Sequence, residues 1–193
     1  MTDIQLLVAQ RARTSPLTYT RTAVVLHWLA AALILLNIAL GLRMEHFPGY
    51  SHGSPEWNAA LFWHASFGAL VLWLAVTRWI WRSMHPAPAL PASVPDWQAK
   101  AAHGVHVTLY AMMIALPLSG FVHRLAGSHP VSFFGLWDWP SLLAKNEPLR
   151  LLSMTVHVTL ASLLGGLVLA HVGAVMKHLL IDRDGVAQRM KWR

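Results

Sequence analysis

The sequence predicts an all-α integral membrane protein, a four-helix bundle with both termini in the cytoplasm. Of its 193 residues, 55% are hydrophobic and only 12% are charged, whereas soluble domains carry roughly 25% charged residues. The chain contains four long apolar stretches, and its mean hydropathy is +0.45. There is too little polar material to cover a globule in water, so we expect residues 1–193 to form one transmembrane domain.

The four apolar stretches each approach the roughly 20 residues that cross a hydrocarbon core. Because a lipid-exposed segment must pair its own backbone groups, each stretch is expected to be a helix. The predicted spans cover about 24–42, 61–81, 103–122 and 154–176. Pro117 lies inside the third span, where membrane helices tolerate proline, often with a kink. The first span is too long for a cleaved signal peptide, and no small-residue cleavage site follows it.

The connections between the spans read as loops. Glycine and proline recur in residues 43–60, and prolines recur in residues 83–97, which cannot continue a helix. The longest loop, residues 123–153, contains FFGLWDWP. We expect this stretch to lie as a short interfacial segment, because tryptophan is enriched at the membrane surface.

Lysine and arginine predict the orientation. Eleven of the 15 lie before the first span, in the second loop or after the fourth span, and these include Arg11, Arg13 and Arg193. The other four are Arg43, Arg124, Lys145 and Arg150. Because cytoplasmic loops carry the excess of positive charge, both termini are placed in the cytoplasm.

Composition also excludes several kinds of site. The chain has no cysteine, so disulfides, thiolate-bound zinc or iron–sulfur clusters, and c-type haem attachment are excluded. The formal charge is +7 and the pI is near 10.6. The basic residues cluster at the ends of the spans without forming a continuous stripe, which favours anionic membrane lipids as partners and not nucleic acid.

Four of the twelve histidines lie inside the spans. A titratable ring there is costly and indicates a functional site, although a histidine can also serve as hydrogen-bonding glue between helices. With both termini inside, His64 and His157 lie in the outer half of the membrane, and His27 and His171 lie in the inner half. The four histidines therefore form two pairs at matched depths.

The spacing of His157 and His171 supports two stacked ligands. They are 14 residues apart, which leaves them within about 40° of one helix face and separated by roughly 21 Å along the axis. Paired axial imidazoles from facing helices are typical of electron-transfer haems. The pattern predicts two b-type haems, with all four histidines binding iron.

Other polar residues lie near the predicted inner haem. Arg21, Arg78 and Arg82 could pair with haem propionates or could be unpartnered positive-inside residues. His103 and His106 are the rivals of His27 at this haem, and we prefer them as nearby polar residues.

The remaining histidines divide into two kinds. His178 follows His171 by seven residues on nearly the same helix face, at the boundary where a titratable donor could meet a quinone headgroup. The others, expected to be solvated in loops or at rims, are His46, His52, His85, His123 and His129.

Nearly the whole chain after about the first twenty residues resembles the bacterial cytochrome b561 family. The resemblance depends on LHWL, FWHASFG with TRWIWR, HGVHVTLYAMMIALPLSGF, VSFFGLWDWP, VHVTLA and LAHVGAVMKHLLIDRDGVAQRM. It implies haem ligation by His27 with His171 on the cytoplasmic side, and by His64 with His157 on the outer side. It also implies a quinone contact for His178.

The resemblance further implies a multi-pass protein of the bacterial inner membrane that transfers electrons between an unknown periplasmic donor and ubiquinone or another quinone. Three alternatives stay open. One is an enzyme, a superoxide:ubiquinone oxidoreductase, and the second is a haem-bearing anchor subunit of a larger redox complex. The third is a colourless metal transporter or proton relay that uses the same histidines.

Overall fold

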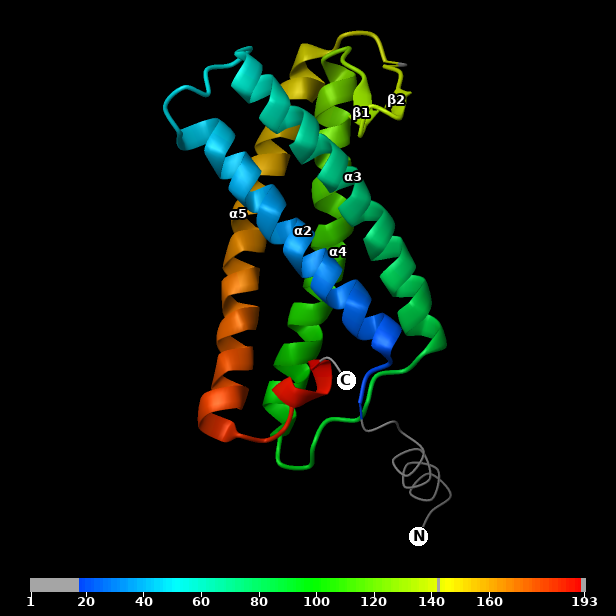
Figure 1. The fold of residues 1–193 in the computed structure, drawn as a ribbon, viewed down its shortest axis with the longest axis vertical. Helices are drawn as coiled ribbons and strands as arrows, with labels where there is room; N and C mark the ends of the chain where they lie inside the picture. Colours follow the sequence, from blue (N-terminus) through cyan, green and yellow to red (C-terminus); the bar gives the residue numbers. More distant parts are fainter. Residues whose placement is uncertain (1–17, 142, 192–193) are drawn as a thin grey trace.

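The computed structural model describes residues 18–141 and 143–191, and four long helices dominate it (Figure 1). They are α2 (Arg21–His46), α3 (Pro55–Met84), α4 (Asp96–Ala126) and α5 (Glu147–Lys177). All four are long and apolar enough to cross a membrane, so the predicted all-α membrane four-helix bundle is confirmed, and the orientation of its termini stays a prediction. Each predicted span lies inside one helix, and every helix extends beyond it.

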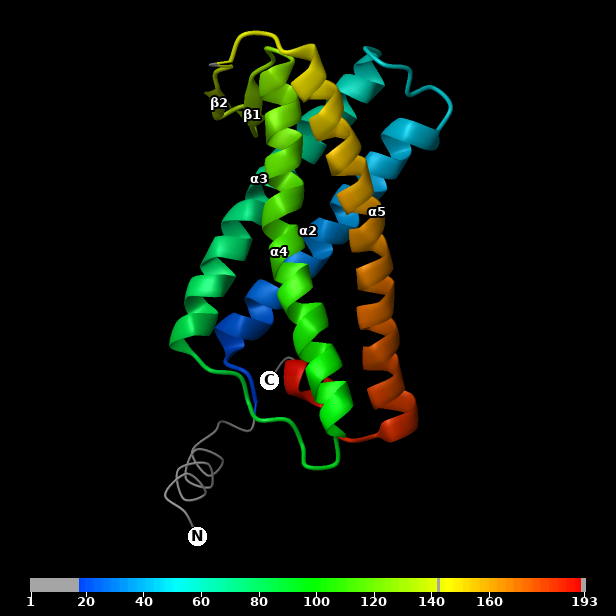
Figure 2. The same ribbon diagram turned by 180° about the vertical axis from the view of Figure 1, so that it is seen from behind.

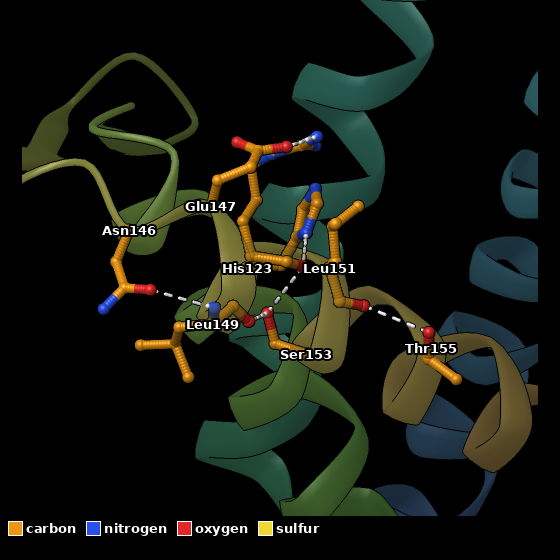
Figure 3. A network of polar contacts seen from close by, with 8 residues as sticks. His123, Asn146, Glu147, Leu149, Leu151, Ser153 and Thr155 are labelled. Carbon is orange, nitrogen blue, oxygen red and sulfur yellow. Dashed lines mark hydrogen bonds and ion pairs between the residues drawn. The ribbon is translucent and has the colours of Figure 1, made fainter.

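Polar residues begin three of the helices. The side chain of Thr20 accepts a hydrogen bond from the Ala23 N–H at 3.2 Å before α2, and Ser54 accepts from the Trp57 N–H at 3.1 Å before α3. Asn146 accepts from the Leu149 N–H at 3.0 Å before α5 (Figure 3). Each cap satisfies a backbone donor that has no partner within its helix, so the loop residues define where the spans begin.

The helices form a bundle in which α2 packs on α3, α4 packs on α5, and α3 joins the two pairs (Figures 1 and 2). A small core of buried residues lies between α2, α3 and α4; its members are Ala30, Leu33, Val71, Leu74, Ala75 and Met113. Large apolar side chains also face outward along the helices, such as Leu169 of α5, which is 76% exposed. This distribution suits a protein whose outer surface contacts lipid tails.

The stretch expected to be an interfacial segment is a short β-hairpin at the end of the bundle near the α4–α5 connection (Figure 1). Strands β1 (Val131–Phe133) and β2 (Trp137–Trp139) pair antiparallel. The backbone at Phe134 and Gly135 has φ angles of 53° and 68°, a left-handed turn that glycine favours. Backbone pairing between the strands satisfies donors and acceptors that an irregular segment would expose.

A buried serine fastens this hairpin to α3. Ser66 is 0% exposed; its hydroxyl donates to the Ser132 carbonyl at 3.3 Å and accepts from the Phe134 N–H at 3.0 Å. The Phe134 ring packs on Trp63 and Phe67. The hairpin therefore covers the part of α3 that carries His64.

The chain folds back after α5. A π-helical turn, η1 (His178–Asp182), is followed by left-handed residues Arg183 and Gly185 and by the 3₁₀ turn η2 (Ala187–Met190). The Trp28 indole donates to the Met190 carbonyl at 3.1 Å, and the Arg189 guanidinium donates to the Ala89 carbonyl. The described chain thus begins and ends at the same end of the bundle (Figure 1). Arg11, Arg13 and Arg193, which were counted for the orientation, lie outside the described residues.

Candidate functional site

The structure brings the four span histidines together in two pairs. The ring centroids of His64 on α3 and His157 on α5 are 6.0 Å apart, and those of His27 on α2 and His171 on α5 are 6.3 Å apart. All four side chains are half-buried. Two metal–nitrogen bonds of about 2 Å place two imidazole centroids about 6 Å apart. Both pairs therefore fit an iron atom between their rings.

Hydrogen bonds fix the tautomers of the His64/His157 pair. His64 Nδ1 lies 3.2 Å from the Asn37 carbonyl of α2. His157 Nδ1 lies 3.1 Å from the Leu116 carbonyl and 3.0 Å from Ser119 Oγ, both on α4. A carbonyl only accepts, so Nδ1 carries the proton in both rings, and the other nitrogen, Nε2, is left to bind a metal.

Ser119 is held in place by its own donor bond. Its hydroxyl donates to the Leu116 carbonyl at 2.7 Å, which leaves an oxygen lone pair to accept from His157 Nδ1. The next residue, Gly120, is also in contact with this ring. A Cβ at position 120 would lie 3.0 Å from His157 Cε1, closer than ordinary contact allows. Helix α4 thus supplies no histidine to this pair but determines where His157 lies.

The Asn37 side chain joins α2 to α3 at the same depth. With its amide nitrogen turned toward α3, it donates to the His64 carbonyl at 2.9 Å, and its oxygen accepts from the Gly68 N–H at 3.1 Å. A polar side chain between membrane helices stabilises their packing. Asn37 therefore holds the backbone that carries His64.

The His27/His171 site has different neighbours. His27 Nδ1 faces the Arg78 guanidinium at 3.4 Å, and a guanidinium only donates. The ring of His106, on α4, lies 5.4 Å from that of His171. His27 and His106 are thus both close enough to His171 to be its partner at the inner site. The 6.3 Å separation of the His27 and His171 ring centroids matches two iron–nitrogen bonds better than the 5.4 Å separation for His106. His103 is exposed.

The three arginines proposed for propionates differ in burial. Arg78 is half-buried, and its Cζ lies 5.2 Å from the Tyr110 ring centroid in a cation–π contact. Arg21 and Arg82 are exposed. Arg78 is therefore the arginine whose side chain reaches the His27/His171 site.

His178 is the centre of a polar cluster at the C-terminal end of α5. Its side chain is 15% exposed, and its Nδ1 lies 2.6 Å from Asp184 Oδ2 and 3.4 Å from Asp182 Oδ2. Lys177 pairs with Asp182. The three acidic and imidazole groups are also close enough to hold a metal ion. The short His178–Asp184 contact is already a complete hydrogen bond, so the simpler chemistry is that of an imidazole with a carboxylate partner.

Asp184 keeps its charge in this cluster. Burial acts to raise its pKa, but hydrogen bonds from the Val186 N–H and from His178 outweigh burial and hold the pKa of Asp184 below its ordinary range. An ionised carboxylate at Nδ1 orients the imidazole and leaves Nε2 for a ligand. His178 follows His171 by seven residues, about 10 Å along a helix.

Cationic groups gather at the opposite end of the bundle, around the α4–α5 connection. His123 Nδ1 donates to the Arg150 carbonyl at 3.0 Å (Figure 3), and Arg150 pairs with Glu147 at 2.5 Å. The pKa of His129 is lowered, first by partial burial and then by neighbouring positive charge. That charge comes from Arg124, Arg150, His123 and Lys145.

The expectation that the remaining histidines are solvated needs correction for two of them. His123 and His85 are half-buried and hydrogen-bonded, because each belongs to a helix end and not to an open loop. His46, His52 and His129 are exposed as expected.

Several residues of these sites escaped the sequence reasoning. They are Asn37, Ser119, Gly120 and Asp184. The polar residues inside apolar spans, Asn37 and Ser119, could have been found by the same cost argument that found the histidines. The role of Gly120 required knowing which ring faces it.

Comparison with known proteins identifies relatives along nearly the whole chain. The family described as "Prokaryotic cytochrome b561" matches residues 18–193. "Cytochrome b561 homolog 2" of Escherichia coli (strain K12) is 31% identical over 179 residues, which are 91% of this chain and 92% of the relative. "Cytochrome b561 homolog 1" of the same organism is 28% identical over 172 residues, 89% of this chain and 96% of the relative.

Proposed function

Because this chain belongs to the prokaryotic cytochrome b561 family, a family of membrane haem cytochromes, we propose that it carries two b-type haems and transfers electrons between a periplasmic-side donor and membrane quinone. It is a multi-pass bacterial membrane protein. The observation that supports two haems is the presence of two half-buried histidine pairs, at 6.0 and 6.3 Å, in one bundle.

In this proposal His64 and His157 hold the outer haem, and His27 and His171 hold the inner one. Bound there, the haems would supply one-electron transfer through iron, which cycles between its ferric and ferrous states. The chain supplies one imidazole nitrogen from each of the four rings, and Arg78 is the arginine beside the inner pair. Burial of these rings between the helices would limit the access of water to a bound metal.

The quinone is proposed to bind near His178, on the side of the inner haem. Reduction of a quinone takes up two protons, so its site needs a group that can donate them. The His178–Asp184 pair, 2.6 Å apart, is such a group at the end of α5. Gln188 Oε1 is buried without a hydrogen-bond partner among the described residues, which leaves an acceptor in the same C-terminal segment.

The proposed location is the inner membrane, with both termini in the cytoplasm. The described chain begins and ends at one end of the bundle (Figure 2), and that end carries Arg78, Arg82, Lys177 and Arg189. An excess of positive charge marks the cytoplasmic side. The opposite end, with the hairpin, then faces the periplasm and the donor.

A haem count by site tests the proposal. The purified protein is expected to show a reduced b-type α-band and two haems per chain. His157→Ala and His27→Ala are each expected to lose one haem, whereas His52→Ala, which changes an exposed loop histidine, keeps two. A colourless protein, or a His157→Ala variant that keeps both haems, contradicts the proposal.

Superoxide is the second candidate for the outer donor. The cations around His129 would attract a small anion, since a cluster of one charge raises the local concentration of its opposite. Stopped-flow mixing of superoxide with the oxidised protein should then reduce haem rapidly, more slowly at high salt. Absence of fast reduction would leave another periplasmic donor.

A further inference from the structure

We infer that the two haem sites differ in reduction potential, the His64/His157 site being the lower, so that electrons run from the outer side toward the inner side. The inference rests on the proposed haem ligation. The inference depends on the group that lies next to Nδ1 of each histidine ring. A hydrogen-bond acceptor or a charge at Nδ1 changes the basicity of Nε2, the nitrogen that would bind the metal.

Both outer rings donate Nδ1–H to oxygen. His64 donates to the Asn37 carbonyl at 3.2 Å, and His157 donates to the Leu116 carbonyl and Ser119 Oγ at 3.1 and 3.0 Å. Such a bond draws the proton away from the ring and raises the basicity of Nε2. A more basic ligand stabilises ferric iron over ferrous iron, which lowers the reduction potential.

The inner rings lack this support. Within residues 18–141 and 143–191, neither His27 nor His171 donates to a backbone carbonyl. With Nε2 of His27 on the metal, its Nδ1 carries the proton, so the Arg78 guanidinium 3.4 Å away acts on this ring through its charge and not as a hydrogen-bond donor. A fixed positive charge beside the metal favours the reduced state, because reduction adds a negative charge. Both differences act in the same direction and place the inner potential above the outer one.

The electron balance agrees with this direction. A one-electron donor at the outer side is oxidised, and one electron passes between the sites without making or breaking a bond. Two such electrons, with two protons taken up at the inner side, convert a quinone to a quinol. Transfer from the lower to the higher potential needs no further input of free energy.

Ser119 is therefore a positioning residue for the outer site. It acts through His157 and does not touch the metal. In the parent protein the His157 Nδ1–H is shared between the Leu116 carbonyl and Ser119 Oγ. Without the serine hydroxyl the Leu116 carbonyl still accepts this hydrogen bond, so the ferric-to-ferrous ratio changes only moderately. We expect a change of a few-fold up to about tenfold, and tenfold corresponds to about 59 mV for a one-electron couple.

Redox titration of the full-length protein, followed in the haem α-band, tests the inference. Ser119→Ala is expected to raise the lower midpoint and leave the upper one in place, with both haems bound. Ser162→Ala is the matched control, because Ser162 is exposed on α5 and, among the described residues, its hydroxyl donates to the Val158 carbonyl of its own helix. At the inner site, Arg78→Gln should lower the upper midpoint, and Arg78→Lys should retain it.

A variant that binds one haem shows which midpoint potential belongs to which site. It also tests the order of the potentials separately from the proposed haem ligation. His157→Ala is expected to keep one haem with the higher midpoint. If it keeps one haem with the lower midpoint, the order of potentials is overturned although the ligation stands. If it keeps both haems, the ligation itself fails. A Ser119→Ala protein whose two midpoints match the parent's also overturns the inference.

Discussion

Gly120 of α4 lies against the ring of His157 on α5, so closely that a Cβ at position 120 would be 3.0 Å from Cε1 and 3.1 Å from Nδ1. The contact joins α4, which contributes no histidine to the His64/His157 pair, to α5, which contributes His157. Because His157 is also hydrogen-bonded to the Leu116 carbonyl at 3.1 Å, its ring has little room to yield.

Gly120→Ala is accordingly expected to displace His157 and to lower the occupancy of one haem. Overpacking of a tight contact costs about 1–3 kcal/mol, which is a roughly 5- to 150-fold loss in affinity. Haem content per chain measures it. Gly104→Ala is the control on the same helix, since nothing lies within 4 Å of a Cβ there; equal haem loss in both variants would contradict the packing argument.

The ring planes of the two pairs predict a spectroscopic signature. The planes of His64 and His157 meet at 76°, and those of His27 and His171 meet at 62°. Axial imidazoles that are nearly perpendicular leave the iron d orbitals almost degenerate, which gives a strongly anisotropic low-spin signal. Electron paramagnetic resonance of the oxidised protein should show this type of signal from both haems. Signals typical of parallel rings would show that the rings rotate when haem binds.

His178 and Asp184 should act together in quinone reduction. His178→Ala is expected to slow reduction of a soluble quinone analogue by roughly 10²-fold, the lower range for loss of a general acid, with the haem content unchanged. Asp184→Asn should have a smaller effect in the same direction, because the imidazole remains but loses its ionised partner at 2.6 Å. Asp138→Asn in the hairpin is the control. Unchanged rates in both test variants would place the quinone elsewhere.

Acid should loosen the C-terminal segment through Asp184. Its pKa in the folded protein lies below the ordinary 3.8, so ionised Asp184 contributes stability that is present above that value and is lost as the pH falls through the folded pKa. Limited proteolysis after α5, followed between about pH 5 and about pH 3, should show increasing cleavage at the acid end. Asp184→Asn should be cleaved more readily near neutral pH and should lose most of the pH dependence.

The sequence by itself determined the four spans and the level of each span histidine along the bundle. Apolar stretches of about 20 residues can cross a bilayer only as helices, and the helices of the structure contain all four stretches. The position of each histidine along its span was sufficient to predict which rings lie at the same level. Even so, the hairpin at Val131–Trp139 was missed, because two three-residue strands leave little periodicity in a sequence.

The tertiary structure alone decided what surrounds each ring. Which carbonyl faces His64, how near Gly120 comes to His157, and that His106 approaches His171 to 5.4 Å depend on helix rotation and crossing. These quantities follow from side-chain packing between helices, and hydropathy does not record them. The return of Asp184 to His178 likewise needed the left-handed turn at Arg183 and Gly185. The length and hydropathy of each span determine how deep a residue lies in the membrane. Side-chain packing between the helices determines which residues it contacts.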